Sequence, residues 1–261
     1  MTDALLLVGR RTERSGEVLS THARRLRERA AADAVHVVQY TQNPTRTVTT
    51  ALDDVEAETA VVIPIVVDRE HFPTDAVAAA TPTGVRVSEP IGHSPAVTDL
   101  LLDRAHAAAD APTETSLVLV GLGRGGAAST ERAVESHAAR VRASACFDQV
   151  VTGYLVADPS VECVGYEVVN DDVVVVPLFV ADDESVTERV PDRLRLPNRT
   201  VAYTSPLGTH DLLTRAIEAE LARQCVLAAG RSPTAIGPSP SGTSLVADGD
   251  GAQRFSGDGT E

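Results

Sequence analysis

Short, almost uninterrupted apolar runs alternate along this chain with longer segments in which apolar residues recur at helical spacing. The runs are rich in valine, leucine and isoleucine, which is typical of parallel strands buried on both faces of a sheet. The first run is Leu5–Gly9 (LLLVG), and the segment Val18–Ala30 that follows it has helical periodicity. Strands that alternate with helices in this way predict an α/β fold, with a parallel sheet covered by helices on both faces.

The pattern predicts four strands in each half of the chain. After the first strand and helix, we expect strands at Val35–Tyr40, Ala60–Val67 and Val85–Glu89 and helices at Thr45–Val55, Thr74–Ala80 and Ala96–Ala109. The second half repeats this order, with strands at Leu117–Gly121, Gln149–Val156, Val173–Val180 and Thr200–Ser205. Its helices are expected at Ser129–Ala143, at a short segment before Val173, at Ser185–Leu194 and at Asp211–Ala229.

Three short motifs occur twice, in the same order, at a nearly constant offset of 112 to 116 residues. The pairs are LLLVG and LVLVG, VVIPIVV and VVVPLFV, and EPIG and SPLG. Such a repeat predicts two copies of one domain. We place them at residues 1–113 and 114–230, and we expect the Ser-, Pro- and Gly-rich segment 231–261 to be a disordered tail.

The charge balance narrows the classes of partner. The 261 residues include 37 acidic and 23 basic side chains, the basic ones all arginine, so the net charge is −14. This argues against binding to nucleic acid or to an anionic membrane surface, both of which need a basic face. Surplus acid without lysine is typical of a salt-adapted surface, so we expect a halophilic source.

Other features of the sequence indicate a soluble cytoplasmic protein. The three cysteines have no CxxC spacing, and no apolar run reaches the length of a membrane helix. A Walker loop is absent, and Gly121, Gly123 and Gly126 match the dinucleotide fingerprint without the acid expected after the next strand. We interpret these glycines as residues of a tight turn and expect no nucleotide cofactor, with a nucleotide-binding oxidoreductase kept as a further alternative.

Candidate chemistry lies in the loops that follow the strands, because ligands of open parallel sheets bind beyond the carboxyl ends of the strands. His71 follows a buried strand, and Asp75, four residues later, is placed to orient its imidazole as a metal ligand or general base. His93 and His210 occupy the loops after the fourth strand of each half, where both can face the same cleft. Each of these histidines has a plain alternative as a surface or turn residue.

At this point the motifs resemble a known family. The stretches LLLVGRRTE, VVIPIVVDREHFPTDAV and EPIGHSP, with LVLVGLGRGG, VVVVPLFVADDESVTERVP and TSPLGTH in the second half, are similar to the CbiX-type class II tetrapyrrole chelatases, the sirohydrochlorin cobaltochelatase and ferrochelatase group. The resemblance covers residues 1–229 and includes the tandem, two-domain form. It implies two flavodoxin-like domains with a cleft between them.

The resemblance also implies an activity. Such a chelatase inserts Co²⁺ or Fe²⁺ into a sirohydrochlorin-type tetrapyrrole without ATP, in cobalamin or sirohaem biosynthesis, and histidines bind the substrate metal and remove pyrrole protons. The family's first-loop histidine is replaced here by Arg10 and Leu122, and its second histidine is kept as His71 but aligned with Ser185 in the other half. Only one ligand of the family's histidine pair is therefore kept. The candidates for a new partner of His71 at the metal are His93, His210 or an acid such as Glu70, and the alternative is that metal insertion is weak or lost.

Three further expectations concern the arginines near the cleft, a rival function and the oligomeric state. Arg10, Arg11 and Arg124 lie at strand ends beside the expected cleft, where their guanidinium groups can pair with the carboxylates of a tetrapyrrole. The missing histidines favour a rival function, a non-catalytic carrier or regulatory relative that binds tetrapyrrole or metal. We expect the protein to be a monomer or a homodimer, because the duplication can supply the cleft within one chain.

Overall fold

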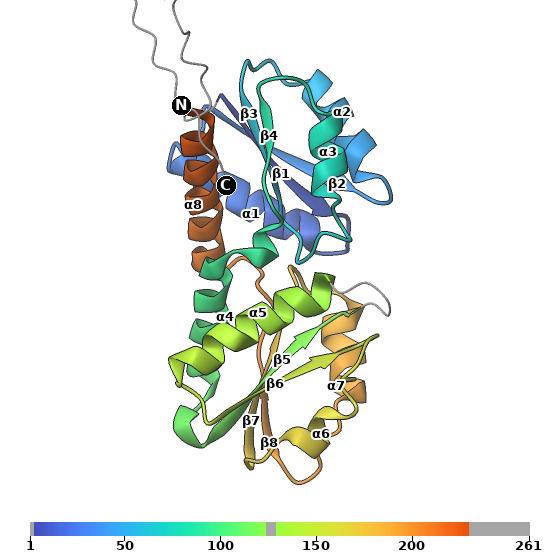
Figure 1. Ribbon diagram of the computed structural model, residues 1–261, viewed down its shortest axis with the longest axis vertical. Helices are drawn as coiled ribbons and strands as arrows, with labels where there is room; N and C mark the ends of the chain where they lie inside the picture. Colours follow the sequence, from blue (N-terminus) through green and yellow to red (C-terminus); the bar gives the residue numbers. More distant parts are fainter. Residues whose placement is uncertain (1–2, 124–128, 230–261) are drawn as a thin grey trace, which may run out of the picture. The chain divides into compact units, whose positions relative to one another are not determined.

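Two four-stranded parallel sheets form the framework of the chain, which a computed structural model describes at residues 3–123 and 129–229 (Figure 1). The first half comprises β1 (Ala4–Arg10), α1 (Ser15–Glu28), β2 (Ala34–Tyr40), α2 (Pro44–Asp53), β3 (Ala60–Pro64), α3 (Thr74–Ala80), β4 (Val85–Val87), the 3-10 turn η1 (Ile91–His93) and α4 (Pro95–Ala108). The second comprises β5 (Thr115–Gly121), α5 (Ser129–Ser144), β6 (Gln149–Tyr154), α6 (Val164–Glu167), β7 (Asp172–Pro177), the π-helical turn η3 (Ser185–Arg189), α7 (Val190–Arg193), β8 (Thr200–Tyr203) and α8 (Asp211–Ala229). The predicted fold class and order of elements are confirmed.

The strand order is the same in both sheets, β2-β1-β3-β4 and β6-β5-β7-β8. The continuous apolar runs occupy the central strands because these strands are buried on both faces. Leu5 and Leu7 of β1 belong to one hydrophobic cluster, whereas Leu6 and Val8 belong to another on the opposite face. The apolar residues of β5 divide in the same way between two clusters.

Both third strands end earlier than the sequence pattern predicts. β3 ends at Pro64 and β7 at Pro177, although valine and isoleucine continue the apolar run beyond each proline. Proline has no backbone N–H, so it cannot continue the hydrogen-bonded ladder towards the next strand. The next residues, Ile65 and Leu178, still donate backbone hydrogen bonds to Val8 and Val120 of the central strands, at 2.7 Å each, and they begin the segments that line the site.

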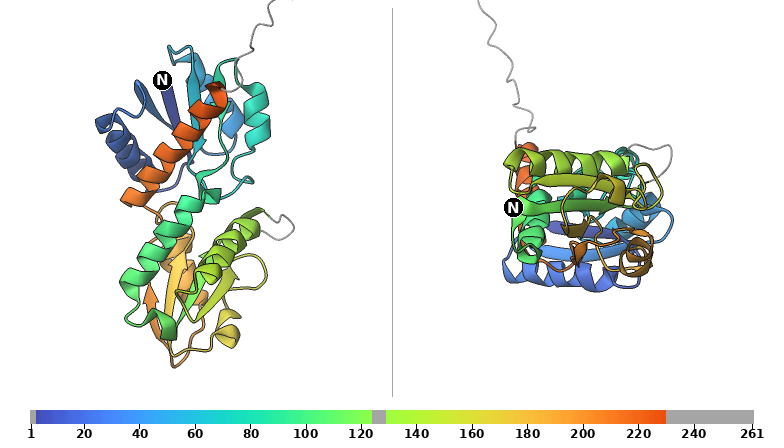
Figure 2. Two further views of the ribbon diagram at one scale, coloured as in Figure 1. Left: turned by 60° about the vertical axis from the view of Figure 1, so that its left-hand side comes forward. Right: turned by 90° about the horizontal axis from the view of Figure 1, so that it is seen from below.

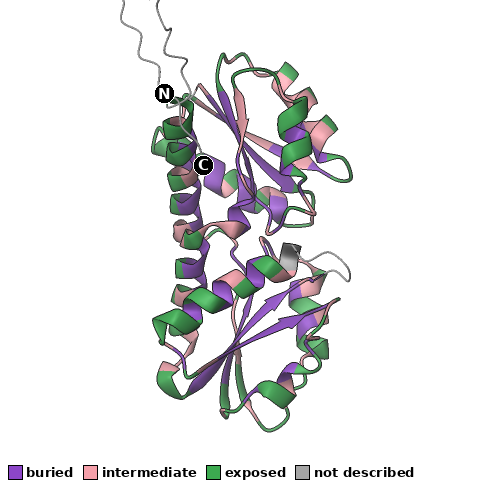
Figure 3. Cartoon of the chain, viewed as in Figure 1, coloured by how far each residue is buried: buried purple, intermediate pink, exposed green. Residues whose placement is uncertain are grey.

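The last helix of each half packs on the sheet of the other half. α4 lies against β7 and α5, whereas α8 lies against β3 and α1, as the turned view shows (Figure 2). One hydrophobic cluster consequently includes Leu7 and Ile63 of the first sheet together with Leu119 and Val176 of the second. Figure 3 shows buried residues along the strands of both sheets. The repeat has a predicted boundary at residue 113, but the exchange of helices makes residues Met1–Gly230 one compact unit.

Two buried histidines join the halves in equivalent ways. On α1, His22 Nδ1 lies 2.8 Å from Thr214 Oγ1 of α8, and its Nε2 lies 2.9 Å from the carbonyl oxygen of Gly208. On α5, His137 Nδ1 lies 2.8 Å from Thr98 Oγ1 of α4, and its Nε2 lies 2.7 Å from the carbonyl oxygen of Gly92. We call these two sets of contacts the histidine clasps. Each ties a helix of one half to the exchanged helix and fourth-strand loop of the other.

The predicted tail, residues 231–261, lies outside the described residues. Within residues 3–123 and 129–229, no helix is long and apolar enough to cross a membrane.

Candidate active site

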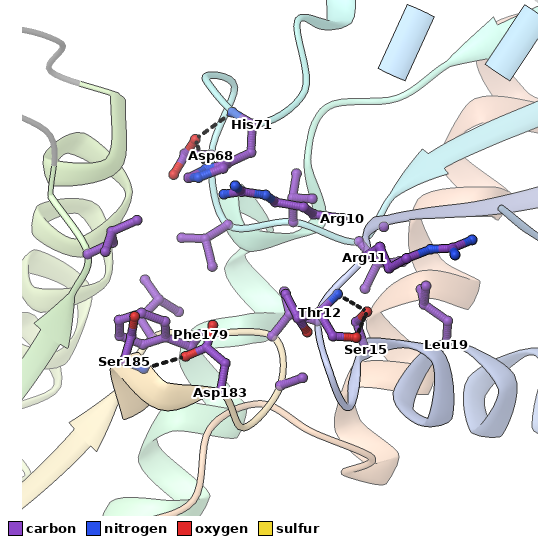
Figure 4. A pocket seen from close by; sticks show the side chains of 18 of the residues that line it. Arg10, Arg11, Thr12, Ser15, Leu19, Asp68, His71, Phe179, Asp183 and Ser185 are labelled. Atoms are coloured by element: carbon purple, nitrogen blue, oxygen red, sulfur yellow. Dashed lines mark hydrogen bonds and ion pairs between the residues drawn. The ribbon is translucent and has the colours of Figure 1, made fainter. Parts of the chain in front are cut away.

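A cavity of about 390 Å³ opens where the carboxyl ends of the two sheets meet (Figure 4). The first half contributes the segments after β1 and β3, and the second half contributes Leu122 after β5 and the segment after β7. Much of the wall is apolar, with Leu19, Ile65, Val67, Leu122, Leu178 and Phe179 among its residues. A cavity at this edge agrees with the expectation from open parallel sheets.

His71 lies in this cavity wall and is held by Asp68, the first residue after the apolar run of β3. The Asp68 side chain is 1% exposed, and its Oδ1 accepts hydrogen bonds from the backbone N–H groups of Glu70 and His71, at 2.9 and 3.0 Å. The same oxygen lies 2.9 Å from His71 Nδ1 (Figure 4). The buried Tyr40 hydroxyl donates to the His71 carbonyl oxygen. The loop is thus fixed on both sides of the imidazole.

This contact selects one tautomer of His71. A carboxylate only accepts hydrogen bonds, so Nδ1 carries the proton and Nε2 carries the lone pair. Within the described part of the chain, no group is hydrogen-bonded to Nε2, and the side chain is 18% exposed on the cavity wall. An imidazole oriented by a carboxylate in this way can accept a proton or bind a metal ion.

Asp75, which the sequence suggested as the partner of His71, does not hold it. Its carboxylate lies 3.7 Å from Arg69 Nη1 and is 92% exposed. Asp75 begins the first turn of α3, and the loop between Asp68 and Pro73 is compact enough to bring the nearer carboxylate to the ring instead. The orienting residue is therefore Asp68 rather than Asp75.

The three histidines expected to share a metal ion are not brought together. His210 Nε2 lies 3.1 Å from Asp103 Oδ2 of α4, and its Nδ1 faces the backbone N–H of Leu212. His93 ends η1, where burial lowers its pKa, and neither histidine lines the cavity. The fourth-strand loops are instead packed against the exchanged helices. Residues 3–123 and 129–229 contain no cluster of three or more His, Cys, Asp or Glu side chains suited to a metal.

Two of the three arginines expected at the cleft line the cavity, and the third lies outside the described residues. Arg10 ends β1 and Arg11 follows it, and in Figure 4 the Arg10 side chain extends towards His71 while that of Arg11 extends to the opposite side. Thr12 is the next residue, and its Oγ1 is buried against the cavity without a hydrogen-bond partner in the described chain. Arg124 falls in the segment that is not described.

One arginine that lines the cavity was not among the residues predicted from the sequence. Arg189 is the last residue of η3, half-buried, and its Nη1 lies 3.4 Å from Ser185 Oγ. The available signal was the position of η3 directly after the third strand of the second half, the equivalent of the loop that carries His71. Helical spacing from Ser185 would have placed Arg189 on the same face as Ser185.

The equivalent turn of the second half lacks a histidine. Asp183 Oδ1 accepts hydrogen bonds from the backbone N–H groups of Ser185 and Val186, at 2.9 and 3.3 Å, just as Asp68 does from Glu70 and His71. This register aligns Ser185 with Glu70 and Val186 with His71, which corrects the alignment of Ser185 with His71 made from the sequence. Val186 is buried in the apolar core of the second half. The site is therefore asymmetric on a symmetric framework.

A second cavity, of about 480 Å³, adjoins the first and shares Arg10, His71 and Leu122 with it. Tyr40, Thr41, Gln42 and Glu70 line it from the first half, and Gly123 and Val156 line it from the second. Gln42 and Val156 are the positions after the second strand of each half. The loops after the first, second and third strands thus all contribute to this region.

The glycine motif at the end of β5 allows the backbone to make a tight turn. Gly123 has a φ of +64°, and a Cβ atom there would lie 2.7 Å from the Cβ of Ala157 and 2.8 Å from that of Tyr154. Such a position excludes side chains on both conformational and steric grounds. The interpretation of these residues as a tight turn holds for Gly123, while Gly126 lies outside the described residues.

The sequence matches one family model and a curated relative. Residues 116–224 match the model of the CbiX family. A probable sirohydrochlorin cobaltochelatase of Halobacterium salinarum is 27% identical over 126 residues, which make up 39% of this chain and 43% of that protein. The match therefore spans less than half the length of this curated relative.

Solved structures share the fold. SirB from Bacillus subtilis with Fe³⁺ matches with a TM-score of 0.70 and 18% identity, over 88% of this chain and 98% of that one. The structure of CbiX, the terminal enzyme of sirohaem biosynthesis in denitrifying bacteria, matches with a TM-score of 0.65 and 16% identity, over 85% and 98%. DR2241 from Deinococcus radiodurans, described as similar to chelatases, matches with a TM-score of 0.65 and 20% identity, but only over 54% of its length. The resemblance in sequence motifs and fold is confirmed.

Proposed function

We propose that this chain, whose residues 116–224 match the model of the CbiX family and whose two halves have the fold of solved chelatases, inserts a divalent metal into a tetrapyrrole. The substrate metal is Co²⁺ or Fe²⁺, and the tetrapyrrole is of the sirohydrochlorin type. The reaction is that of an ATP-independent lyase of cobalamin or sirohaem biosynthesis, acting in the cytoplasm. The curated cobaltochelatase and the cobalt and Fe³⁺ complexes of SirB support this class of substrate.

The observation that carries the proposal is the lone pair of His71 Nε2 on the wall of the cavity. Metal insertion requires two pyrrole N–H groups to lose their protons while the metal exchanges water ligands for ring nitrogens. His71 Nε2 accepts a pyrrole proton, and the buried Asp68 carboxylate stabilises the resulting imidazolium through Nδ1–H. This proton then leaves to water through the open side of the cavity, after which Nε2 can accept the second pyrrole proton in the same way.

The same imidazole can deliver the metal. Neutral imidazole is a good ligand for Co²⁺ and Fe²⁺. A site with one histidine binds the ion weakly and leaves most of the ion's coordination positions to water. Weak binding suits a metal that is a substrate and must be transferred to the macrocycle. Since a ring nitrogen cannot hold a metal and a proton together, delivery of the ion frees Nε2 for the pyrrole proton.

The walls of the cavity suit the rest of the macrocycle. Leu122, Leu178 and Phe179 offer apolar contacts to a flat ring, and Arg10 and Arg11 offer guanidinium groups to its carboxylates. The candidate ligands are thus His71 for the metal and the proton, and arginines for the acid groups. Thr12 Oγ1 adds a hydroxyl that lacks a partner within the described chain.

A second candidate function is a carrier that binds tetrapyrrole without metallating it. The observation in its favour is the pair of residues at the first-loop positions, Arg10 and Leu122, neither of which binds a metal. In addition, the described residues contain no group of three or more His, Cys, Asp or Glu side chains suited to a metal.

The two functions separate in an absorbance time course. Sirohydrochlorin and Co²⁺ are mixed with wild-type protein, with His71→Ala or with no protein, and the spectrum of the metallated product is followed. A chelatase speeds metallation well above the protein-free rate, and we expect His71→Ala to lose at least about tenfold of that rate because it loses both the proton acceptor and the ligand. A bound-tetrapyrrole spectrum with no gain in rate would instead establish the carrier.

A further inference from the structure

Three arginines of the cavity form no ion pair with an acid of the described chain. They are Arg10, Arg11 and Arg189, and all three line the cavity. The chain has 37 acidic and 23 basic residues, so acids are plentiful overall. A guanidinium group left unpaired among so many carboxylates is available to a ligand that carries its own.

Some arginines elsewhere in the described chain are paired with acids, whereas exposed ones such as Arg46 and Arg195 are not. Arg29 contacts Asp211 at 2.5 Å and Glu218 at 2.7 Å, Arg223 contacts Glu220 at 2.7 Å, and Arg69 pairs with Glu89. The two acids of the cavity wall, Asp68 and Asp183, each accept hydrogen bonds from the backbone N–H groups of their own turn, and neither forms an ion pair with Arg10, Arg11 or Arg189 within the described chain. The cavity wall therefore offers three guanidinium groups to a ligand.

The unpaired arginines come from both halves. Arg10 and Arg11 stand at the end of β1, whereas Arg189 ends η3, whose first turn is fixed by the Asp183 carboxylate. Arg189 is half-buried, and its contact with Ser185 Oγ steers the side chain along the wall. The same cavity has apolar lining residues, including Leu122, Leu178 and Phe179. Both halves of the chain thus contribute guanidinium groups to one largely apolar cavity.

We propose that Arg189 is a specificity-determining residue which, with Arg10, binds carboxylates at opposite edges of the ligand. The cavity then selects macrocycles that carry acid groups around the whole ring over macrocycles that carry them on one edge. This inference rests on the proposed function, because it specifies which tetrapyrroles the site accepts. It assigns to the second half, which lacks a histidine at the equivalent turn, the task of recognising the substrate.

The test measures binding of three metal-free porphyrins to the full chain by fluorescence titration at one fixed ionic strength. Uroporphyrin III has eight carboxylates and coproporphyrin III has four, both distributed around the ring, while protoporphyrin IX has two on a single edge. Wild type is compared with Arg10→Gln, Arg189→Gln and the double variant. Arg195→Gln and Arg46→Gln serve as matched controls, because each removes an exposed arginine outside the cavity that has no ion pair in the described chain.

We expect wild type to bind uroporphyrin most tightly and protoporphyrin most weakly. Arg189→Gln should weaken uroporphyrin binding by about fivefold to tenfold and protoporphyrin binding by less than about twofold, because only the former reaches both sides of the cavity. In the double variant the two losses should multiply, since the arginines hold different carboxylates. Unchanged thermal unfolding will show that the variants are folded.

Two other outcomes would overturn the inference and tell its failure from that of the proposed function. If wild type binds all three porphyrins equally, or if Arg189→Gln matches the control variants, the carboxylate selection is wrong while tetrapyrrole binding stands. If wild type binds none of the porphyrins and no sirohydrochlorin, the proposed function fails and this inference fails with it.

Discussion

A single carboxylate decides what His71 can do. Asp68 is buried at the end of the β3 segment, and one of its oxygens holds both the backbone of the turn and the Nδ1 of the ring. The imidazole is therefore fixed in orientation and in tautomer before any ligand arrives. Asp75, only four residues from the histidine in sequence, pairs with Arg69 at the surface and has no such effect.

The two acids can be separated by isosteric substitution. Asp68→Asn keeps an oxygen that can accept the backbone N–H groups but removes the charge that stabilises the imidazolium, so we expect the metallation rate to fall by about tenfold to a hundredfold. Asp75→Asn is the matched control and should stay within about twofold of wild type, because an exposed ion pair contributes little. Equal rates for Asp68→Asn and wild type in the absorbance assay would show that Asp68 only shapes the loop.

At the scale of elements, the exchange of α4 and α8 determines where the two sheets meet. The histidine clasps connect each exchanged helix to the opposite half, and both imidazoles are buried and hydrogen-bonded at both nitrogens. Burial lowers the pKa of His137 to about 4 and also lowers that of His22. Both rings are consequently neutral in the folded protein near neutral pH.

This has a consequence for stability at acidic pH. The folded protein holds His137 unprotonated down to a pKa of about 4, whereas the unfolded chain protonates it below its ordinary value of 6.5. The unfolded state thus binds more protons between these values, and the free energy of unfolding should fall by up to about 3 kcal/mol as the pH drops from 6.5 to 4.

Denaturant titrations across this pH range test the assignment. In His137→Gln the free energy of unfolding should depend less steeply on pH than in wild type, whatever its absolute value. His106→Gln, which replaces an exposed histidine of α4, should leave the wild-type slope unchanged. Identical slopes in all three proteins would mean that the clasp does not control the acid sensitivity.

At the scale of the whole molecule, charge dominates the behaviour in solution. A net charge of −14 on 261 residues causes self-repulsion in the compact state, which salt screens. We therefore expect the midpoint temperature of unfolding to rise by several degrees when KCl is increased from about 0.2 M to about 2 M. NaCl at equal ionic strength should give the same rise. A midpoint that falls or stays constant in both salts would contradict a salt-adapted surface.

Much of the fold follows from local patterns in the sequence. Apolar runs such as Leu5–Gly9 are buried on both faces because they contain no polar side chain that would favour a solvent-exposed face. The repeat of three motifs implies a second sheet of the same topology. The placement of His71 beyond a strand end was likewise predictable, because parallel strands end at one edge of the sheet. Even the early ends of β3 and β7 have a visible cause in Pro64 and Pro177.

Only the tertiary structure decided which side chains meet. Spacing along the chain favoured Asp75, His93 and His210 as partners of His71, but the compact turn at Asp68 and the packing of the fourth-strand loops against exchanged helices exclude them. It also brought Arg189 into a cavity with Arg10, residues that lie far apart in sequence. The physical reason is that periodicity reports burial within one element, whereas contacts between elements depend on how the helices pack across the two sheets.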